Sequence, residues 1–210
     1  MELLGKEIAR SLLQINAIKL EPANPFTWAS GWKSPIYCDN RKTLSYPSLR
    51  KKLQNAFVQV IEAHFQKPDV IAGVATGAIA HGLMVAEAMG LPFVYVRSSA
   101  KMHGLGNQIE GDLMAGANVL VIEDLVSTGK SSLAAVEALR EAGANILGMA
   151  AIFTYGFPVA QMNFEKSDVE LHTLSNYSTL IDVALESNYI NDADMEALRY
   201  WREHPEKWGQ

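Results

Sequence analysis

The segment Val119-Leu-Val-Ile-Glu-Asp-Leu-Val-Ser-Thr-Gly-Lys-Ser131 decides the fold. It opens with a short apolar run, which is typical of a buried strand. Two adjacent acids, Glu123 and Asp124, stand at the end of this run, and a polar loop at 127–131 then leads into an alanine-rich helix. A strand that ends in acids, followed by hydroxyls, a glycine and a helix start, forms a receptor for a sugar that carries a phosphate.

The same segment nearly matches a nucleotide-binding P-loop, which requires Gly, four residues and then Gly-Lys-Ser/Thr. Residues 129–131 fit, but Asp124 occupies the position of the first glycine. A carboxylate there repels phosphate oxygens, which disfavours a nucleotide phosphohydrolase. A ribose with Mg²⁺ suits the two acids better, and the loop amides can hold one phosphate at the helix N-terminus. A plain helix cap by Ser127 or Thr128 is the alternative without function, and it leaves both acids unexplained.

The bulk composition limits what the chain binds. Hydrophobic residues make up 49% of the 210 residues, enough for a sizeable core. A formal net charge of −5 argues against general binding to nucleic acid or membranes, so an anionic ligand needs a local basic site. The single cysteine, Cys38, excludes an internal disulfide and fits a reducing compartment. Neither a signal peptide nor a membrane-spanning segment is visible, and we expect a cytoplasmic protein.

Apolar periodicity and turn residues predict strands that alternate with helices. Such alternation favours an α/β fold with a mostly parallel central sheet flanked by helices. Ligands of these sheets bind at the carboxyl ends of the strands, where the segments 74–77, 97–104 and 123–131 should converge. We expect a small N-terminal helix and hood at 1–45 and a core at 46–210. The predicted strands are 69–74, 93–96, 118–123, 146–153 and 169–173, and the predicted helices are 4–15, 49–65, 78–89, 131–142, 159–164, 180–185 and 193–202.

Two loops besides 127–131 carry residues suited to an anion. The small residues of Gly73-Val-Ala-Thr-Gly77 let backbone amides approach an anion closely, although an ordinary tight turn is equally compatible. The long loop that starts at Arg97 also carries Lys101, His103 and several glycines. Such a loop can close over a polyanion and exclude water, and its length favours a functional role over a merely solvated surface.

A third stretch, residues 26–39, reads Phe-Thr-Trp-Ala-Ser-Gly-Trp-Lys-Ser-Pro-Ile-Tyr-Cys-Asp. Its aromatic, serine and lysine side chains suit a flat, polar heterocycle. A packed N-terminal flap is equally compatible with the same residues.

These motifs together resemble a known family. The segment 119–131 is similar to the diphosphoribose-binding signature of type I phosphoribosyltransferases. The stretch Arg97…Lys101-Met-His103-Gly104 resembles the mobile catalytic loop of the orotate phosphoribosyltransferase family, and residues 26–39 resemble its N-terminal hood. The resemblance covers essentially the whole chain. It implies the type I phosphoribosyltransferase fold, transfer of phosphoribose from 5-phospho-α-D-ribose 1-diphosphate to orotate, Mg²⁺ as cofactor, and a homodimer with shared active sites.

The resemblance also implies a role for each motif. The catalytic residues would be Arg97, Lys101, His103 and Asp124, with the three basic groups neutralising the diphosphate as it leaves. Orotate would contact Ser127 and, from the hood, Phe26, Ser30 and Lys33. Mg²⁺ would be held mainly by the substrate diphosphate, without a certain protein ligand. The residues expected to bind the phosphoribosyl diphosphate are Thr76, Gly77, Arg97, Lys101, His103, Glu123, Asp124, Leu125, Val126, Ser127, Thr128, Gly129, Lys130 and Ser131.

Two alternatives keep the same phosphoribosyl site. A phosphoribosyltransferase acting on a purine base is disfavoured by the hood and by the loop that starts at Arg97. A non-catalytic regulator that senses the diphosphate could dispense with that basic loop, and a DNA-binding regulator should show a basic stripe. The intact loop and the net charge of −5 disfavour the regulator.

Overall fold

The computed structural model describes residues 2–28, 31, 33–98 and 108–208. The chain forms two compact units, one from Pro47 to Leu174 and one that combines Met1–Tyr46 with Ser175–Gln210. The first boundary falls beside the one expected from the sequence. The residues from Ser175 onward, which the sequence interpretation assigned to the core, group with the N-terminal residues instead.

The unit from Pro47 to Leu174 is built on a six-stranded sheet with the strand order β10-β9-β8-β5-β6-β7. Strands β9, β8, β5 and β6 run parallel to their neighbours, and β7 pairs antiparallel with β6. The predicted α/β class with a mostly parallel sheet is confirmed. The strands are β5 (Val70–Val74), β6 (Phe93–Val96), β7 (Ile109–Glu110), β8 (Asn118–Val126), β9 (Asn145–Thr154) and β10 (Leu171–Asn176).

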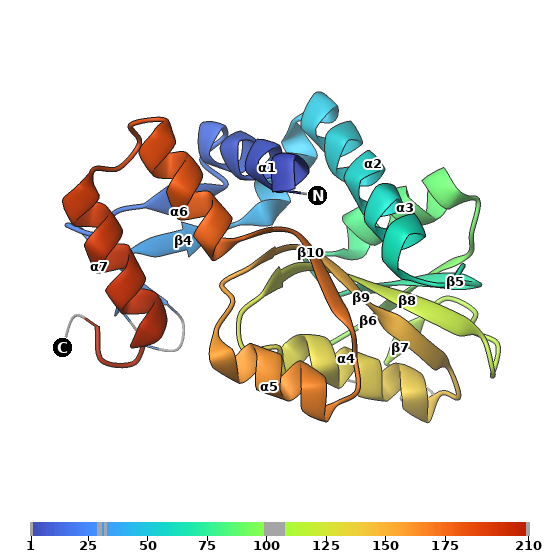
Figure 1. The fold of residues 1–210 in the computed structure, drawn as a ribbon. Coiled ribbons are helices and arrows are strands. Elements are labelled where there is room, and N and C mark those ends of the chain that lie inside the picture. The colour runs from blue at the N-terminus through green and yellow to red at the C-terminus, as the bar shows by residue number, and fades with distance from the viewer. Residues whose placement is uncertain (1, 29–30, 32, 99–107, 209–210) are drawn as a thin grey trace. The chain divides into compact units, whose positions relative to one another are not determined.

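Helices cover both faces of this sheet (Figure 1). Helices α2 (Pro47–His64) and α3 (Ile79–Met89) lie on one face, and α4 (Lys130–Glu141) and α5 (Pro158–Lys166) lie on the other. Helix α3 stops at Gly90, which takes the left-handed conformation (φ 65°) expected of a glycine at a helix end. Because both faces are covered, the central strands β5, β8 and β9 consist mostly of buried apolar residues.

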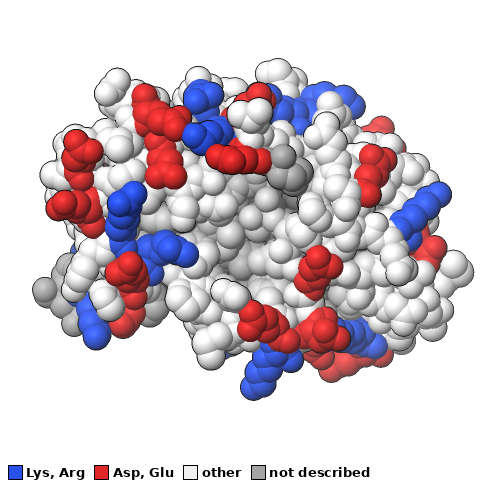
Figure 2. Space-filling view, in the orientation of Figure 1, with Lys and Arg blue, Asp and Glu red and all other residues white. Residues whose placement is uncertain are grey.

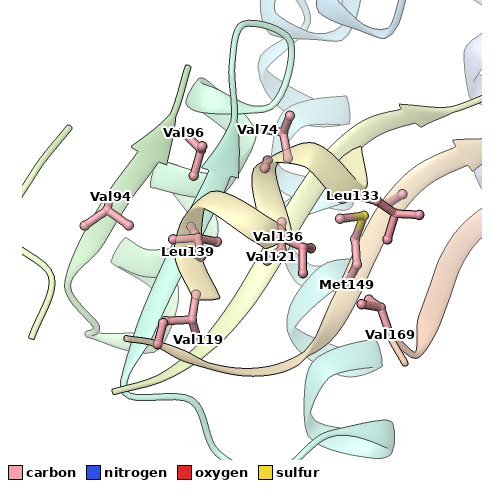
Figure 3. Close-up of a cluster of buried hydrophobic side chains, with 14 of the residues drawn as sticks. Val74, Val94, Val96, Val119, Val121, Leu133, Val136, Leu139, Met149 and Val169 are labelled. Atoms are coloured by element: carbon pink, nitrogen blue, oxygen red, sulfur yellow. The ribbon is translucent and has the colours of Figure 1, made fainter. Parts of the chain in front are cut away.

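The core beneath α4 follows from the alternation of side chains along the strands (Figure 3). Val119 and Val121 of β8 point to this face and meet Val136 and Leu139 of α4, all four fully buried. Burying each such side chain stabilises the fold by roughly 1.5–3 kcal/mol. The residues between them, such as Leu120, are equally buried on the other face. The side chains of residues 119–122 therefore pack into the core on both faces of the sheet.

The strand order creates a crevice at the carboxyl edge of the sheet. From β5 the chain crosses through α3 to β6 on one side, whereas from β8 it crosses through α4 to β9 on the other side. Strands β5 and β8 are nonetheless neighbours, paired from Val70↔Val119 to Gly73↔Ile122. The crossovers diverge between these two strands, which is where parallel α/β sheets bind ligands.

Strand lengths differ from the sequence prediction at this edge. Strand β8 continues to Val126 because its pairing with β9 extends as far as Val126↔Thr154. The acids at 123–124 therefore belong to the strand itself and not to the loop after it. Strand β7 lies inside the segment 97–113, which the sequence predicted as a loop, and β10 begins two residues later than predicted, at Leu171.

The second unit joins both ends of the chain. Helix α1 packs against α6, and the core includes Trp201 (0% exposed), whose ring meets Trp28 edge-on with centroids 5.6 Å apart. The indole N–H of Trp28 donates to the Ile36 carbonyl at 3.1 Å, which fixes the expected hood segment on this core. The elements are α1 (Glu2–Gln14), β1 (Ile18–Leu20), β2 (Phe26–Thr27), β3 (Lys33–Ser34), β4 (Ile36–Cys38), the 3-10 helix η1 (Asn40–Ser45), α6 (Tyr177–Glu186) and α7 (Asp192–Glu203).

The surface shows no bias toward one sign of charge on the face drawn in Figure 2, where acidic and basic side chains are interspersed. The numbers of basic and acidic residues in the sequence are likewise similar, at 18 and 23. Within the described residues, no helix combines the length and the apolar character that crossing a bilayer demands.

Candidate active site

The two acids of β8 have different surroundings. Glu123 is 4% exposed, and its Oε2 accepts a hydrogen bond of 2.7 Å from the Ser132 hydroxyl of α4. Its Oε1 accepts from the backbone N–H of Asp124 at 2.9 Å. Neighbouring side chains of a strand point to opposite faces, and Asp124 is accordingly only half-buried. Glu123 is therefore locked into the sheet–helix layer, whereas Asp124 presents its carboxylate at the crevice.

Burial and the adjacent Asp124 carboxylate raise the pKa of Glu123 to about 8, against the lowering effect of its hydrogen bonds from Ser132 and the Asp124 N–H. At neutral pH this acid pair consequently carries less than two full negative charges. A reduced charge lessens the repulsion that an incoming phosphate ester meets.

The loop after β5 lies against the Asp124 carboxylate. A Cβ atom placed on Gly77 would overlap the carboxylate oxygens of Asp124, so only glycine allows this approach. The carboxyl ends of β5 and β8 thus meet at the crevice. The structure brings the segments 74–77 and 123–124 together, as the strand pattern predicted.

The end of β6 joins the same edge. The Ala75 N–H donates to the Val96 carbonyl at 2.8 Å, which ties the loop after β5 to β6. Arg97 follows, and its backbone N–H and carbonyl are both paired with Gln108, at 2.9 and 2.7 Å. The Arg97 guanidinium lies 3.5 Å from a Glu110 carboxylate oxygen. The base of the predicted basic loop is therefore fixed at the site edge, while Lys101 and His103 lie outside the described residues.

The loop between β8 and α4 leaves a helix N-terminus open to an anion. Gly129, with φ 79°, is the N-cap residue of α4 and has no side chain with which to cap the helix. The alternative of a plain cap by Ser127 or Thr128 is therefore wrong. The uncapped N–H groups of the first turn and the positive end of the helix dipole favour an anion here. Lys130 and Ser131, both exposed, stand at the same end of the helix.

The expected hood residues belong to the other unit. The Phe26 ring lies against the Tyr37 ring with centroids 5.6 Å apart. Lys33 is exposed and donates from Nζ to the Thr27 hydroxyl at 2.9 Å. Ser30 lies outside the described residues.

The residues at the crevice suit a magnesium ion that arrives with a substrate. Mg²⁺ usually takes one or two carboxylates and completes its shell with water and substrate phosphates. The Asp124 carboxylate beside Gly77 is an oxygen donor of this kind. Within the described parts of the chain, no group of three or more His, Cys, Asp or Glu side chains could hold a metal by itself.

Sequence reasoning missed two residues that support this site. Ser132 could have been found, because it shares the apolar face of α4 with Val136 and Leu139, where a buried hydroxyl needs a partner. Asn163 of α5 donates from Nδ2 to the Thr128 carbonyl at 2.9 Å. No local pattern marks it, because its partner lies 35 positions away in the chain.

Comparisons with known proteins identify the family of this chain. Residues 44–187 match the model of the phosphoribosyl transferase domain. The chain is 57% identical over 209 residues to the orotate phosphoribosyltransferase of Porphyromonas gingivalis, with 100% of both chains covered. The chain belongs to the orotate phosphoribosyltransferase family. The resemblance given by its motifs is thereby confirmed.

Other orotate phosphoribosyltransferases agree in sequence and in fold. That of Listeria monocytogenes is 54% identical over 207 residues, covering 99% of both chains. The solved orotate phosphoribosyltransferase of Aeropyrum pernix matches with a TM-score of 0.75 at 25% identity, over 88% of this chain and 99% of that one. The enzyme therefore shares the type I phosphoribosyltransferase fold with these relatives.

Proposed function

We propose that the enzyme transfers the phosphoribosyl group of 5-phospho-α-D-ribose 1-diphosphate to orotate, giving orotidine 5′-monophosphate and diphosphate in the synthesis of UMP. One observation carries this proposal. In a member of the orotate phosphoribosyltransferase family, the acids at 123–124 stand at the β5/β8 crevice beside an uncapped helix N-terminus.

The donor would bind along the end of β8. The carboxylates of Glu123 and Asp124 would accept hydrogen bonds from the ribose hydroxyls. Residues 127–131 would bind the 5-phosphate, with backbone N–H groups and the hydroxyls of Ser127, Thr128 and Ser131 as donors, and Leu125 and Val126 would complete the donor site at the end of β8. Positioning of this kind, before any bond breaks, contributes by converting two separate reactants into one oriented complex.

The leaving diphosphate would lie toward β5 and β6. Breaking the bond at the ribose C1 places positive charge on the sugar and negative charge on the diphosphate. Thr76 and Gly77 would face the diphosphate, and Arg97, Lys101 and His103 would neutralise it as charge develops. Groups that are preplaced where charge develops stabilise the transition state more than the ground state.

Mg²⁺ would be held mainly by the donor's diphosphate, with the Asp124 carboxylate as an oxygen donor of the protein at the crevice. When bound, the cation supplies charge neutralisation of the leaving group. Omission of Mg²⁺ with a chelator should abolish turnover, and undiminished turnover would remove the cation from the proposal.

Lys101 would be the mobile charge of the basic loop, as the family resemblance implies. Replacing it by alanine should lower kcat by about 10²–10³, the range for losing one preorganised charge donor. Steady-state rates over a range of both substrates measure this effect. An unchanged kcat in Lys101→Ala would remove the role.

Orotate would be covered by the hood and would contact Phe26, Ser30, Lys33 and Ser127. The segment 153–156 contains no arginine that could pair with the carboxylate of orotate. The base contacts of this chain would therefore rest more on the hood. Lys33→Ala should raise the KM for orotate more than the KM for the donor, and the reverse pattern would contradict this assignment.

We also propose a homodimer in which each subunit completes the partner's site, as in the family that the motifs resemble. Mixing two variants, each inactive at a different position, should then restore activity in the heterodimer. Lys101→Ala mixed with Asp124→Asn is the natural pair, since one residue belongs to the basic loop and the other to β8. Activity no higher than that of either variant alone would argue against shared sites.

The proposed compartment is the cytoplasm. Cys38 is the single cysteine of the sequence and forms no disulfide, which suits a reducing environment. Fractionation of cells that produce the protein tests this, with recovery outside the cytoplasm as the contrary result.

Parallel assays with orotate, adenine and xanthine test the proposed reaction against a purine-specific enzyme. Each base is supplied with the phosphoribosyl donor and Mg²⁺, and diphosphate release is measured. We expect release with orotate alone. Release with a purine instead would favour the purine-specific alternative, and tight donor binding without any release would favour the sensing regulator.

A further inference from the structure

Helix α5 holds the loop at 127–129 through two contacts. Asn163 donates from Nδ2 to the Thr128 carbonyl at 2.9 Å. The next residue, Phe164, is 4% exposed, and its ring fills the place of a side chain at Gly129, where an added Cβ would lie 2.7 Å from Cε2. Two consecutive residues of one helix therefore fix two consecutive residues of the loop.

The hydrogen bond from Asn163 contributes little to the stability of the fold. It lies in the wall of an open groove of about 900 Å³ between α4 and α5, so both Asn163 and Thr128 remain half-buried. A hydrogen bond that competes with water contributes little net stability. Phe164, which belongs to the main apolar core, contributes more to stability. The value of Asn163 lies instead in the direction that it gives to one peptide group.

A trans peptide group points its C=O and its N–H in opposite directions. The single cis peptide bond of the described residues is Ala75–Thr76, so the Thr128–Gly129 peptide is trans. Because the Thr128 carbonyl points toward Asn163, the Gly129 N–H points away from α5. It therefore joins the N–H groups at the start of α4. Gly129 has no side chain and a φ of 79°, and the loop's own hydroxyls do not cap the helix, so the local sequence leaves this peptide orientation to tertiary contacts.

We propose that Asn163 is a positioning residue for the phosphate loop, holding the Gly129 N–H toward the 5-phosphate of the donor. This rests on the proposed function of the loop as the 5-phosphate site. Asn163 touches neither substrate and acts only through the Thr128–Gly129 peptide. Its contribution is specific for the phosphate on the ribose and does not extend to the diphosphate.

The test measures the affinities of two separate ligands, ribose 5-phosphate and diphosphate with Mg²⁺, by calorimetric titration. Asn163→Leu removes the donor, and Asn163→Asp replaces it by an acceptor of nearly the same shape that repels the Thr128 carbonyl. Gln161→Leu is the matched control. It makes the same kind of change on the same helix, at an exposed side chain whose recorded hydrogen bond is to Glu165.

We expect both Asn163 variants to bind ribose 5-phosphate about three- to tenfold more weakly, the range for one lost hydrogen bond. Their affinity for diphosphate should stay within twofold of the parent enzyme. In turnover, the KM for the phosphoribosyl donor should rise while the KM for orotate remains unchanged. Gln161→Leu should match the parent enzyme in every measurement, and thermal unfolding midpoints should agree within about 3 °C.

Three results would overturn the inference. Equal weakening of the affinities for ribose 5-phosphate and for diphosphate would mean that Asn163 only supports the fold. Unchanged ribose 5-phosphate affinity in Asn163→Asp would mean that the orientation of the Thr128–Gly129 peptide does not depend on Asn163. The same weakening in Gln161→Leu would assign the effect to the helix as a whole. If the parent enzyme itself binds diphosphate but no ribose 5-phosphate, the proposed function of the loop fails and not merely the role of Asn163.

Discussion

The carboxyl ends of β8 and β9 are neighbours in the sheet, paired as far as Val126 and Thr154, yet their residues differ in kind. Strand β8 carries two acids close to its end, at Val126, and a polar loop follows it. Aromatic residues follow the end of β9 at Thr154, with Tyr155 and Phe157 both 3% exposed and their rings stacked at 5.5 Å. Even the hydroxyl of Thr154 is engaged locally, because it accepts from the Gly156 N–H at 3.0 Å.

The comparison shows that the two neighbouring strand ends have different roles, one in binding a ligand and the other in packing. Near the end of β8, the half-buried Asp124 carboxylate lies at the crevice, where its charge serves a ligand more than the fold. The end of β9 closes over an apolar cluster and leads into α5, whose residues hold the loop that follows β8. Substitutions at β8 should consequently reduce activity with little loss of stability, and substitutions at β9 should do the reverse.

The largest effect should follow from Asp124→Asn. The change keeps the shape of the side chain but removes the charge at the crevice, and we expect kcat/KM to fall by about 10²–10³. Steady-state kinetics measure it, with Asp112→Asn, an exposed position, as the matched control. A loss below threefold would show that the charge of this acid has no part in the reaction.

Phe153→Ala probes the end of β9. Phe153 is fully buried and lies opposite Leu125 in the ladder, so the cavity should lower the free energy of unfolding by about 3–4 kcal/mol. Chemical denaturation measures this loss. The kcat of the folded fraction should stay within threefold of the parent value, and a hundredfold loss would erase the contrast between the two strand ends.

Gly77→Ala sharpens the position of Asp124. The added methyl group overlaps the Asp124 carboxylate, so one of the two must move. We expect kcat/KM to fall by about 10–10², because small displacements in an active site cost this much. Kinetics combined with a thermal unfolding scan separate this effect from instability. Full activity would place Asp124 elsewhere during turnover.

The smallest effect concerns Glu123 and pH. Its pKa is raised in the folded protein, so the native state holds the proton more tightly than the unfolded chain does. The free energy of unfolding should therefore fall as pH rises from about 4.5 to about 8. Between pH 5 and 8 we expect the free energy of unfolding to fall more in the parent enzyme than in Glu123→Gln. Denaturation curves at the two pH values measure this, and equal losses in both proteins would contradict the buried, proton-holding state.

Much of this fold could be predicted because its signals are local. Apolar runs marked β5 and β6 within a residue of their observed bounds, and Gly90 marked the end of α3. The extension of β8 could not be predicted, since it depends on pairing with β9 and not on the residues of β8 alone. Strand β7 was missed for the same reason, as its two residues pair with β6 across the basic loop.

The residues of the candidate site also fall into those that the sequence could predict and those that it could not. The acids at 123–124 and the glycine loop at 129 stand in one stretch of sequence, so their chemistry was visible. Their supports were not, because Ser132 and Asn163 act across layers on partners that local spacing does not connect. Sequence also could not show that Glu123 and Asp124 have different roles, since that difference arises from which face of β8 each side chain occupies.

The most direct test of the account is the absorbance of orotate after addition of the phosphoribosyl donor and Mg²⁺. The parent enzyme should consume orotate steadily, and Asp124→Asn should do so at least about 100-fold more slowly at the same folded concentration. Constant absorbance with the parent enzyme, or equal rates for the two proteins, would contradict the claim that phosphoribosyl transfer to orotate occurs at the end of β8.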